Sequence, residues 1–298
     1  MKLLVTGHRG FVGAYVLANG NSVGLCDDDG QAVNLLDAFA VKRCIERERP
    51  DAVLHLAAQS FVPDSFRDPR ATYDTNFTGT HGLLDALKAS CFKGRFLFVS
   101  SADVYGALPE TELPARETTY ARPLNPYAVS KIAAETLCGY WQRAEGMDVV
   151  IARPFNHIGP GQSTRFAISD FAKTIAGIRL GTVGKLLEVG DLDVTRDFTD
   201  VRDVVDAYRL LLTHGKSGET YNICSGVERH LGDAVRLLAE LAGVDIELKP
   251  DAARFRKAGQ RRACGSSDKL RADTGWQPRI DWSTSLRDTL NYWENTLK

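Results

Sequence analysis

The feature that most constrains the fold is a regular alternation of short apolar runs with longer segments of helical spacing. Each apolar run has the length of a buried strand, and the segment after it repeats its apolar residues with the period of an amphipathic helix. The predicted strands lie at residues 3–5, 23–26, 52–56, 96–99 and 149–152, and the predicted helices at 11–18, 38–48, 74–89 and 126–144. Successive strands joined by helices form a parallel sheet through right-handed crossovers. The sequence therefore predicts an α/β chain with a doubly wound parallel sheet.

Composition narrows the class of protein. The chain has 298 residues, 44% of them hydrophobic and 25% charged, with a net charge of -1. This is the composition of a globular protein, and it lacks the excess of positive charge that is typical of nucleic-acid-binding proteins. No apolar run approaches the length of a membrane span and residues 1–7 do not resemble a signal peptide, so we expect no membrane partner and a cytoplasmic location. The six cysteines form no CxxC pair, which predicts free thiols and no metal site.

A glycine-rich loop follows the first predicted strand. Gly7, Gly10 and Gly13 stand at three-residue spacing between this strand and the first predicted helix. In a dinucleotide-binding loop the first glycine permits a tight turn, the second lets the backbone approach a pyrophosphate, and the third lets the helix pack on the sheet. Three glycines in a surface turn would explain the composition but not the position. We therefore predict a dinucleotide cofactor bound by Gly7, Arg9, Gly10, Phe11, Val12 and Gly13.

Tyr127 and Lys131 are candidates for proton transfer. They are four residues apart on the helix predicted at 126–144, so their side chains share one face. A nearby ammonium favours the phenolate, and we expect Lys131 to bring the pKa of Tyr127 towards the working range. The pair also fits a core tyrosine beside a solvated lysine. Ser101 follows the strand predicted at 96–99, at the sheet edge where ligands bind, and can hydrogen-bond the reacting oxygen.

Together these elements resemble the extended short-chain dehydrogenase/reductase family over nearly the whole chain. The glycine loop matches the TGxxGxxG pattern of that family, and the resemblance implies a Rossmann fold, a nicotinamide cofactor and the catalytic set Ser101, Tyr127 and Lys131. It also implies that Asn76 supports the fold, and that Asn34 stands near adenine in place of the usual aspartate. The further cofactor contacts that it implies are Asn34, Leu35, Leu56, Ala57, Ala58, Tyr127, Lys131 and Pro154.

Two residues bear on the form of the nicotinamide cofactor. Asp27 follows the second predicted strand and could bind a ribose hydroxyl, although residues 27–29 equally fit a solvated turn. Arg9 stands inside the glycine loop, where similar reductases use a cation for the 2'-phosphate. We therefore favour NADP(H) over NAD(H).

The second half of the chain carries the substrate signals. Residues 152–162 closely resemble the RPFNHxGPGQ segment of enzymes acting on GDP-linked 6-deoxyhexoses, which implies that Asn156 faces the sugar diphosphate. Residues 189–203 are similar to the nucleotide-binding stretch of these enzymes, which places Arg196 on the diphosphate. Arg256 aligns with the arginine of their RPxEV segment, and the resemblance makes it a further phosphate ligand.

Structural roles are the alternatives for these residues. Asn156 could cap a turn, and Arg196 could pair with the neighbouring Asp197. A basic cluster fits either a small anionic ligand or a solvated face; its members are Arg254, Arg256, Lys257, Arg261 and Arg262.

The reaction type depends on the segment after the predicted active-site serine. Asp103 stands where related 4,6-dehydratases have a glutamate base, and we predict that Ser101, Ala102 and Asp103 contact the sugar. The whole-chain resemblance is closest to reductases of GDP-4-keto-6-deoxy-D-mannose. It implies that reduced nicotinamide delivers hydride to C4 while Tyr127 donates the proton, which gives GDP-D-rhamnose for deoxysugar and lipopolysaccharide synthesis. A GDP-mannose 4,6-dehydratase and a non-catalytic nicotinamide-sensing module are the alternatives.

These signals divide the chain into two lobes. We predict an NAD(P)-binding Rossmann domain at residues 1–160, rejoined by parts of 192–225, and a smaller α/β lobe at 161–298 that mainly binds the nucleotide sugar. Helices are predicted in the second half at 166–178, 201–213 and 231–242. The helices at 74–89 and 126–144 resemble the dimer helices of the family, which implies a homodimer.

Overall fold

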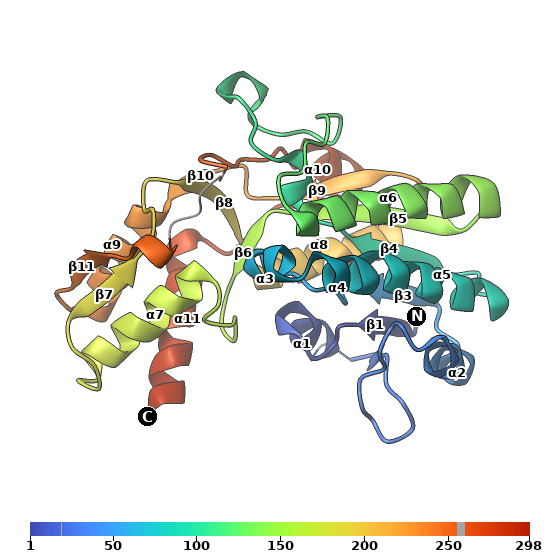
Figure 1. Cartoon of the computed structure of the whole chain (residues 1–298), viewed down its shortest axis with the longest axis horizontal. Coiled ribbons are helices and arrows are strands. Elements are labelled where there is room, and N and C mark those ends of the chain that lie inside the picture. The colour runs from blue at the N-terminus through green and yellow to red at the C-terminus, as the bar shows by residue number, and fades with distance from the viewer. Residues whose placement is uncertain (19, 255–259) are drawn as a thin grey trace.

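The larger lobe is built on a six-stranded parallel sheet with the strand order β2-β1-β3-β4-β5-β9. The computed structural model describes every residue except 19 and 255–259. The strands are β1 (Leu3–Thr6), β2 (Ser22–Gly24), β3 (Ala52–His55), β4 (Arg95–Val99), β5 (Asp148–Pro154) and β9 (Thr220–Ile223). The strand order reverses between β1 and β3, so helices cover both faces of the sheet (Figure 1). The predicted doubly wound α/β fold is confirmed.

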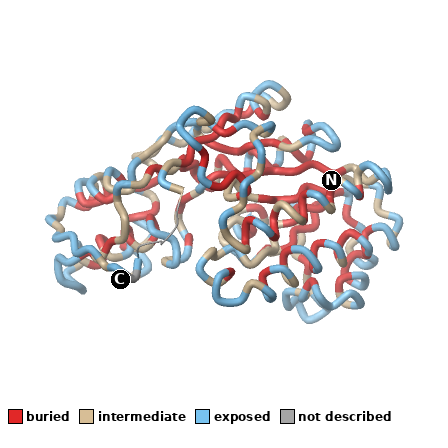
Figure 2. The backbone as a smooth tube through the Cα atoms, turned by 45° about the horizontal axis from the view of Figure 1, so that its top comes forward, coloured by how far each residue is buried: buried red, intermediate tan, exposed pale blue. Residues whose placement is uncertain are grey.

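Alternate residues of each strand enter two different apolar cores. Leu3 and Val5 pack with α1 and α8 on one face, whereas Leu4 packs with α2, α5 and α6 on the other. Both faces of the sheet are covered, so its inner strands are largely apolar, and Figure 2 shows much of the sheet buried. The helices concerned are α1 (Phe11–Leu17), α2 (Ala38–Glu48), α5 (Gly79–Ala89), α6 (Pro126–Glu145) and α8 (Val201–His214).

The helix predicted at 74–89 begins earlier than the periodicity indicated. Helix α4 (Pro69–Tyr73) continues through a π-helical turn at Asp74–Thr78 into α5. Pro69 occupies the first helical position and the Asp68 carboxylate accepts the Ala71 N–H at 2.9 Å, so local capping chemistry sets this start. The π turn directs the buried Asn76 side chain to Gln59 and Ser130. Asn76 therefore joins two helices and a loop.

The smaller lobe has its own apolar core. Its sheets are β10-β8-β6, with β6 (Asn156–Ile158), β8 (Thr195–Asp200) and β10 (Glu228–His230), and the pair β11-β7, with β7 (Leu186–Val189) and β11 (Glu247–Pro250). Helices α7 (Ala167–Arg179), α9 (Leu231–Ala242) and α11 (Trp282–Leu297) enclose this core. Helices α7 and α9 begin within one residue of their predicted starts, and α11 was not predicted. The lobe lies at one end of the large sheet (Figure 1).

The remaining elements connect the lobes and border the large sheet. They are α3 (Val62–Arg67), α10 (Asp268–Thr274) and short 3₁₀ turns at Ala102–Tyr105, Glu110–Glu112 and Ala252–Arg254. Strand β9 and helix α8 come from late in the chain but lie with the large sheet. The domain boundary near residue 160 stays a prediction. Within the described residues, no helix combines the length and the apolar character needed to cross a membrane.

Candidate active site

The predicted site residues come together at one edge of the large sheet. In a parallel sheet all carboxyl ends of the strands lie on the same edge, which is where ligands bind in open α/β folds. The glycine loop follows β1, residues 56–58 follow β3, Ser101 follows β4, and Pro154 ends β5. The structure therefore gathers residues that are up to about half the chain apart in sequence.

The glycines of the loop have different physical roles. Gly7 has a φ of +69°, and a Cβ there would lie 2.8 Å from the backbone N of Ala57. A Cβ on Gly13 would lie 2.6 Å from Cα of His8, so both positions require glycine for the fold itself. Gly10 has a φ of -78°, and a Cβ there would meet only the Gly7 carbonyl oxygen, at 3.2 Å. Because packing makes little demand on Gly10, its lack of a side chain leaves the outer side of the loop open to a ligand.

A buried hydrogen-bond chain connects the glycine loop with the helix carrying Tyr127. The Thr6 hydroxyl accepts the Ala57 N–H at 3.0 Å and donates to Nδ1 of His55 at 2.7 Å. Nε2 of His55 donates to Thr80, which in turn donates to the Asn76 carbonyl. Burial lowers the pKa of His55 to about 3, so the ring is neutral and suits this donor-acceptor pattern. These hydrogen bonds hold the backbone of Ala57 at the sheet edge.

The turn after β2 uses Asp27 for its own structure. The Asp27 carboxylate accepts the N–H groups of Asp29 and Gln31, so the structure agrees with the turn interpretation. Arg9 extends to this turn, where its guanidinium donates to the Gly30 carbonyl at 2.8 Å and to the Gln31 side chain at 3.2 Å. Arg9 is exposed there. The structure thus places a cation, rather than a free carboxylate, beside the end of β2.

The two residues predicted near adenine have different environments. Asn34 is exposed, and its side chain accepts the Leu36 N–H at 3.0 Å. Leu35 is buried in the core between the sheet and α2, α5 and α6. The side chain of Leu35 therefore supports the fold, and only its backbone is left to contact a cofactor.

Ser101, Tyr127 and Lys131 form the predicted constellation. Tyr127 and Lys131 are 8% and 3% exposed, and the Ser101 hydroxyl is hydrogen-bonded to Tyr127. The Lys131 ammonium donates to the Val99 carbonyl at 2.8 Å and lies 5.9 Å from the centre of the Tyr127 ring. Asn125 caps the helix and Pro126 begins it, so local sequence sets the position of Tyr127 and Lys131.

The prediction that Lys131 lowers the pKa of Tyr127 is wrong in this structure. Burial raises the pKa of Tyr127, and the Asp103 carboxylate raises it further; only the hydrogen bond from Ser101 lowers it. Desolvation is the largest cause of the shift, and the ammonium of Lys131 is bonded to a backbone carbonyl rather than to the phenol. Burial also lowers the pKa of Lys131 to about 8. Tyr127 therefore keeps its proton at neutral pH, as a proton donor must.

Folding stability is expected to rise with pH through Lys131. Its folded pKa of about 8 lies below the ordinary value of 10.5, so between these values the unfolded chain holds more protons and a rising pH favours the folded state. The effect is at most about 3 kcal/mol. Urea unfolding of the wild type and Lys131→Met at pH 8 and pH 10.5 measures it: the stability of the wild type relative to the variant should increase over this interval. A difference that does not change with pH would contradict the assignment.

A buried ion pair that we did not predict supports this constellation. Arg153 of β5 forms two hydrogen bonds with the Glu135 carboxylate, at 2.9 and 2.6 Å, and a third with the Tyr105 hydroxyl at 3.0 Å. Tyr105 donates to the Asn222 side chain at 2.6 Å. Glu135 stands one helical turn after Lys131, and Tyr105 ends the turn that carries Asp103. An arginine inside an apolar strand was the signal in the sequence, but its partner could not be deduced from spacing.

The segment with the sugar-enzyme motif lies against the glycine loop. Asn156 is exposed at the start of β6, and the ring of His157 stacks on Phe11 with a centroid distance of 6.1 Å. The Tyr15 hydroxyl of α1 donates to the Pro160 carbonyl at 2.8 Å. The residues predicted for cofactor and for substrate therefore belong to adjoining surfaces.

Arg196 and Asp197 do not form the ion pair that we considered. They are neighbours on β8, so their side chains point to opposite faces of the strand. Arg196 donates to the backbone carbonyls of Thr195 and Arg261, at 2.6 and 3.2 Å. Asp197 is fully buried and accepts the N–H groups of Ser225, Gly226 and Gly265.

The basic cluster is largely neutralised by acidic partners. Arg254 pairs with Asp170, Arg261 pairs with Asp193, and Arg262 bonds to Glu228 at 3.0 Å. Among the described residues of the cluster, the structure thus favours a paired surface over a free anion site. Arg256, the predicted phosphate ligand, and Lys257 lie outside the described residues.

Comparisons with known proteins agree with this geometry. The sequence profile of the GDP-mannose 4,6 dehydratase family matches residues 31–289. A GDP-6-deoxy-D-mannose reductase of Pseudomonas aeruginosa is 47% identical over 300 residues, covering 100% of this chain and 98% of that relative. A dTDP-glucose 4,6-dehydratase of Shigella flexneri is 30% identical, covering 98% of this chain and 92% of that relative.

Solved structures show the same fold. The structure of RMD from Pseudomonas aeruginosa complexed with NADPH is 45% identical and has a TM-score of 0.93, covering 99% of this chain and all of that one. A UDP-glucose 4-epimerase of Thermotoga maritima with UDP-glucose is 28% identical and has a TM-score of 0.90 over the whole of both chains. The chain therefore belongs to the GDP-mannose 4,6 dehydratase family within the extended short-chain dehydrogenases/reductases.

Proposed function

We propose that this protein is an NAD(P)H-dependent reductase that converts GDP-4-keto-6-deoxy-D-mannose to GDP-D-rhamnose. The observation that carries the proposal is the 47% identity, over the whole chain, to a relative named GDP-6-deoxy-D-mannose reductase. The sequence-based prediction of this activity agrees with that relative. The geometry supports it as well, because a protonated tyrosine, a serine hydroxyl and a lysine meet at the ligand-binding edge of the sheet.

Residues of this chain would carry out the proton transfer. Reduced nicotinamide, when bound along the glycine loop, supplies the hydride for the C4 carbonyl. Tyr127 holds its proton until the reaction, because burial raises its pKa, and donates it to the developing C4 oxygen. The Ser101 hydroxyl bonds to Tyr127 and would orient that oxygen. Lys131, fixed by the Val99 carbonyl, keeps a positive charge near the phenolate that forms.

The main rival is a GDP-mannose 4,6-dehydratase. Asp103 stands at the position of the dehydratase base, but it has the shorter side chain, and its backbone N–H in the 3₁₀ turn donates to the Ser101 hydroxyl at 3.1 Å. A carboxylate with one methylene less has a shorter reach towards the sugar. A non-catalytic nicotinamide-sensing module would not need Ser101 bonded to a buried Tyr127 beside a buried Lys131.

One experiment separates these functions. Purified protein is mixed with enzymatically generated GDP-4-keto-6-deoxymannose and either NADPH or NADH, and both the loss of reduced nicotinamide and the sugar product are followed. The reductase consumes reductant and yields GDP-D-rhamnose. Conversion of GDP-mannose to the keto sugar without added reductant would instead establish the dehydratase, and nicotinamide binding without any turnover would establish the sensing module.

We further propose NADPH as the preferred cofactor, with Arg9 as the contact for the 2'-phosphate. The exposed guanidinium lies beside the turn after β2, where that phosphate would be recognised. Arg9→Ala should raise the KM for NADPH about 10- to 100-fold, because a charge-assisted hydrogen bond to the phosphate is lost. The KM for NADH, which lacks this phosphate, should change little. Arg43→Ala removes a nearby arginine that pairs with Asp28 and serves as the control. An equal effect on both cofactors would reject the assignment.

A homodimer and a cytoplasmic location are also proposed. Large apolar side chains are exposed on α3, the α4-α5 helix and α6; they are Phe66, Tyr73, Phe77, Val129 and Tyr140. Contiguous exposed apolar surface commonly marks an interface. We expect light scattering at micromolar concentration to give twice the chain mass of 32.7 kDa, and a monomeric mass would reject the dimer.

A further inference from the structure

The turn that follows Ser101 is anchored at its far end by one buried side chain. Ser101 caps the 3₁₀ turn Ala102–Tyr105, and Tyr105 is the last residue of that turn. Tyr105 is 1% exposed, and its hydroxyl donates to the Asn222 side chain at 2.6 Å and accepts from Arg153 at 3.0 Å. The hydrogen bonds of a 3₁₀ turn have poorer geometry than those of an α-helix, so we expect this turn to take its position from the anchor.

The large sheet holds both partners of the Tyr105 hydroxyl. Arg153 of β5 and Asn222 of β9 are directly opposite each other in the register of these parallel strands, so their side chains lie on the same face. Asn222 is fully buried, and its amide donates to the Ala115 carbonyl at 3.0 Å. The ring of Tyr105 stacks with Phe155, just after β5, at a centroid distance of 6.2 Å. Tyr105 therefore connects the turn to fixed points of the sheet.

Arg153 also holds the helix that carries the rest of the catalytic constellation. Two of its nitrogens donate to the Glu135 carboxylate, at 2.9 and 2.6 Å, and its third nitrogen donates to Tyr105. Tyr127, Lys131 and Glu135 are spaced by four residues on α6 and share one face of that helix. The guanidinium is a planar and rigid fork. One side chain thus sets the distance between α6 and the turn after β4.

We propose that Tyr105 is a positioning residue of the reductase, whose hydroxyl fixes the turn so that Ser101 meets Tyr127. The inference rests on the proposed function. Tyr105 is buried and its hydroxyl is bonded to Arg153 and Asn222, so it acts through the turn and not on the substrate. The Ser101 hydroxyl is hydrogen-bonded to Tyr127, and a displacement of about 1 Å in reacting groups can cost about 100-fold in rate.

Tyr105→Phe tests the proposal because it removes the anchoring hydroxyl and keeps the ring. We expect kcat with the keto sugar to fall about 10- to 100-fold, because the turn is no longer fixed. The Kd for NADPH should not change. Titration with NADPH counts the folded sites, and kcat is expressed per site, so unfolded protein does not contribute to the loss. Asn222→Ala removes the acceptor instead, should lower kcat about threefold or more, and carries the test if Tyr105→Phe does not fold.

The same substitution in a Ser101→Ala background shows whether Tyr105 acts through Ser101. Residues that act through one another have effects that do not add. We therefore expect Tyr105→Phe to lower kcat by less than about twofold once Ser101 is alanine. A full further loss in the double variant would mean that the two residues act independently, and would overturn the proposal.

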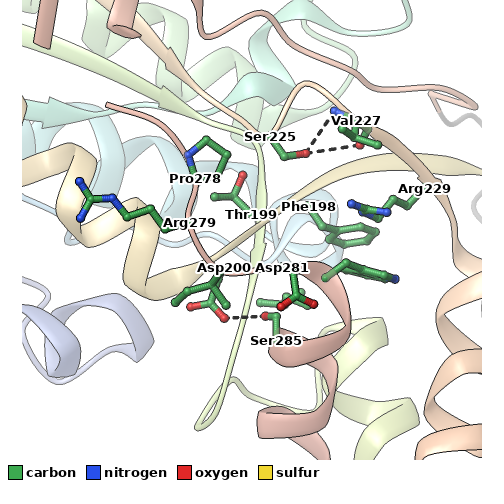
Figure 3. A pocket seen from close by; sticks show the side chains of 13 residues that line it. Phe198, Thr199, Asp200, Ser225, Val227, Arg229, Pro278, Arg279, Asp281 and Ser285 are labelled. Carbon is green, nitrogen blue, oxygen red and sulfur yellow. Dashed lines mark hydrogen bonds between the residues drawn. The ribbon is translucent and has the colours of Figure 1, made fainter. Parts of the chain in front are cut away.

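Ser285→Ala is a matched control for the loss of a buried hydrogen bond. Ser285 donates to Asp200 in the smaller lobe at 2.6 Å, the same length as the bond from Tyr105 to Asn222 (Figure 3). Neither Ser285 nor Asp200 was assigned to cofactor or substrate, so this variant should lose stability and keep kcat. An equal loss of kcat in Ser285→Ala would attribute the effect to stability and reject the positioning role.

The wild type separates this inference from the proposed function. An active wild type with an equally active Tyr105→Phe would refute the positioning role alone. A wild type that leaves the keto sugar unreduced would refute the proposed function, and this inference with it.

Discussion

Replacing Tyr127 by phenylalanine is expected to lower kcat by about a hundred- to ten-thousandfold, the usual value of a positioned proton donor. The substitution removes the hydroxyl that is hydrogen-bonded to Ser101 and keeps the buried ring. Binding of the cofactor depends on the glycine loop and should change little. The measurements are kcat with the keto sugar and the Kd for NADPH, determined separately.

Tyr208→Phe is a matched control for this prediction. Tyr208 is another buried tyrosine, but its hydroxyl has no hydrogen-bond partner and it belongs to the core packed on α8. Its variant should retain kcat and be at least as stable as the wild type, because an unpaired buried hydroxyl is removed. Near-normal turnover of Tyr127→Phe would remove Tyr127 from the mechanism. A loss of NADPH binding in that variant would instead indicate a disturbed site.

Replacing Arg153 by methionine is expected to reduce the free energy of unfolding by about 3–5 kcal/mol. The reason is that Glu135, buried and bonded to Arg153 at 2.9 and 2.6 Å, would be left as an uncompensated charge. The bond from Arg153 to the Tyr105 hydroxyl would also be lost. Urea unfolding at neutral pH measures the change.

A double variant distinguishes the cost of the lone charge from the loss of packing. Arg153→Met combined with Glu135→Leu removes both charges and should recover most of the stability, because replacing a buried ion pair by apolar groups is often neutral. Failure of the second substitution to recover stability would mean that shape, rather than charge, dominates at this position. A single variant that unfolds like the wild type would show that the pair contributes nothing net.

The sheet and the glycine loop were predictable because their determinants are local. An apolar run such as 96–99 must be buried, and its length distinguishes a strand from a helix. The helix of Tyr127 was predicted from its cap and first residue, Asn125 and Pro126, which act within one turn. The start of the α4-α5 helix was missed because we followed apolar period and did not weigh the capping signal of Asp68 and Pro69.

The position of the site was also predictable, because parallel strands necessarily present their carboxyl ends on one edge. This topological rule placed Ser101 at the edge where ligands bind, whereas Pro154 was assigned to the cofactor by the family resemblance. The sequence motif around Asn156 indicated a nucleotide-sugar enzyme by resemblance, not by physical derivation. Its contact with Phe11 of the loop, through the neighbouring His157, became visible only in the structure.

What the sequence by itself determined, therefore, was the alternation of strands and helices in the first half of the chain, the glycines that the loop requires and the place of Ser101 at the edge of the sheet. Tertiary structure alone decided the electrostatics: burial raises the pKa of Tyr127, Arg153 pairs with Glu135, and the Thr199 hydroxyl is buried without a hydrogen-bond partner. The physical reason is the distance along the chain over which each kind of interaction acts. Periodicity, capping and turn chemistry act over a few residues, whereas desolvation and charge pairing depend on which distant segments exclude water from the same space.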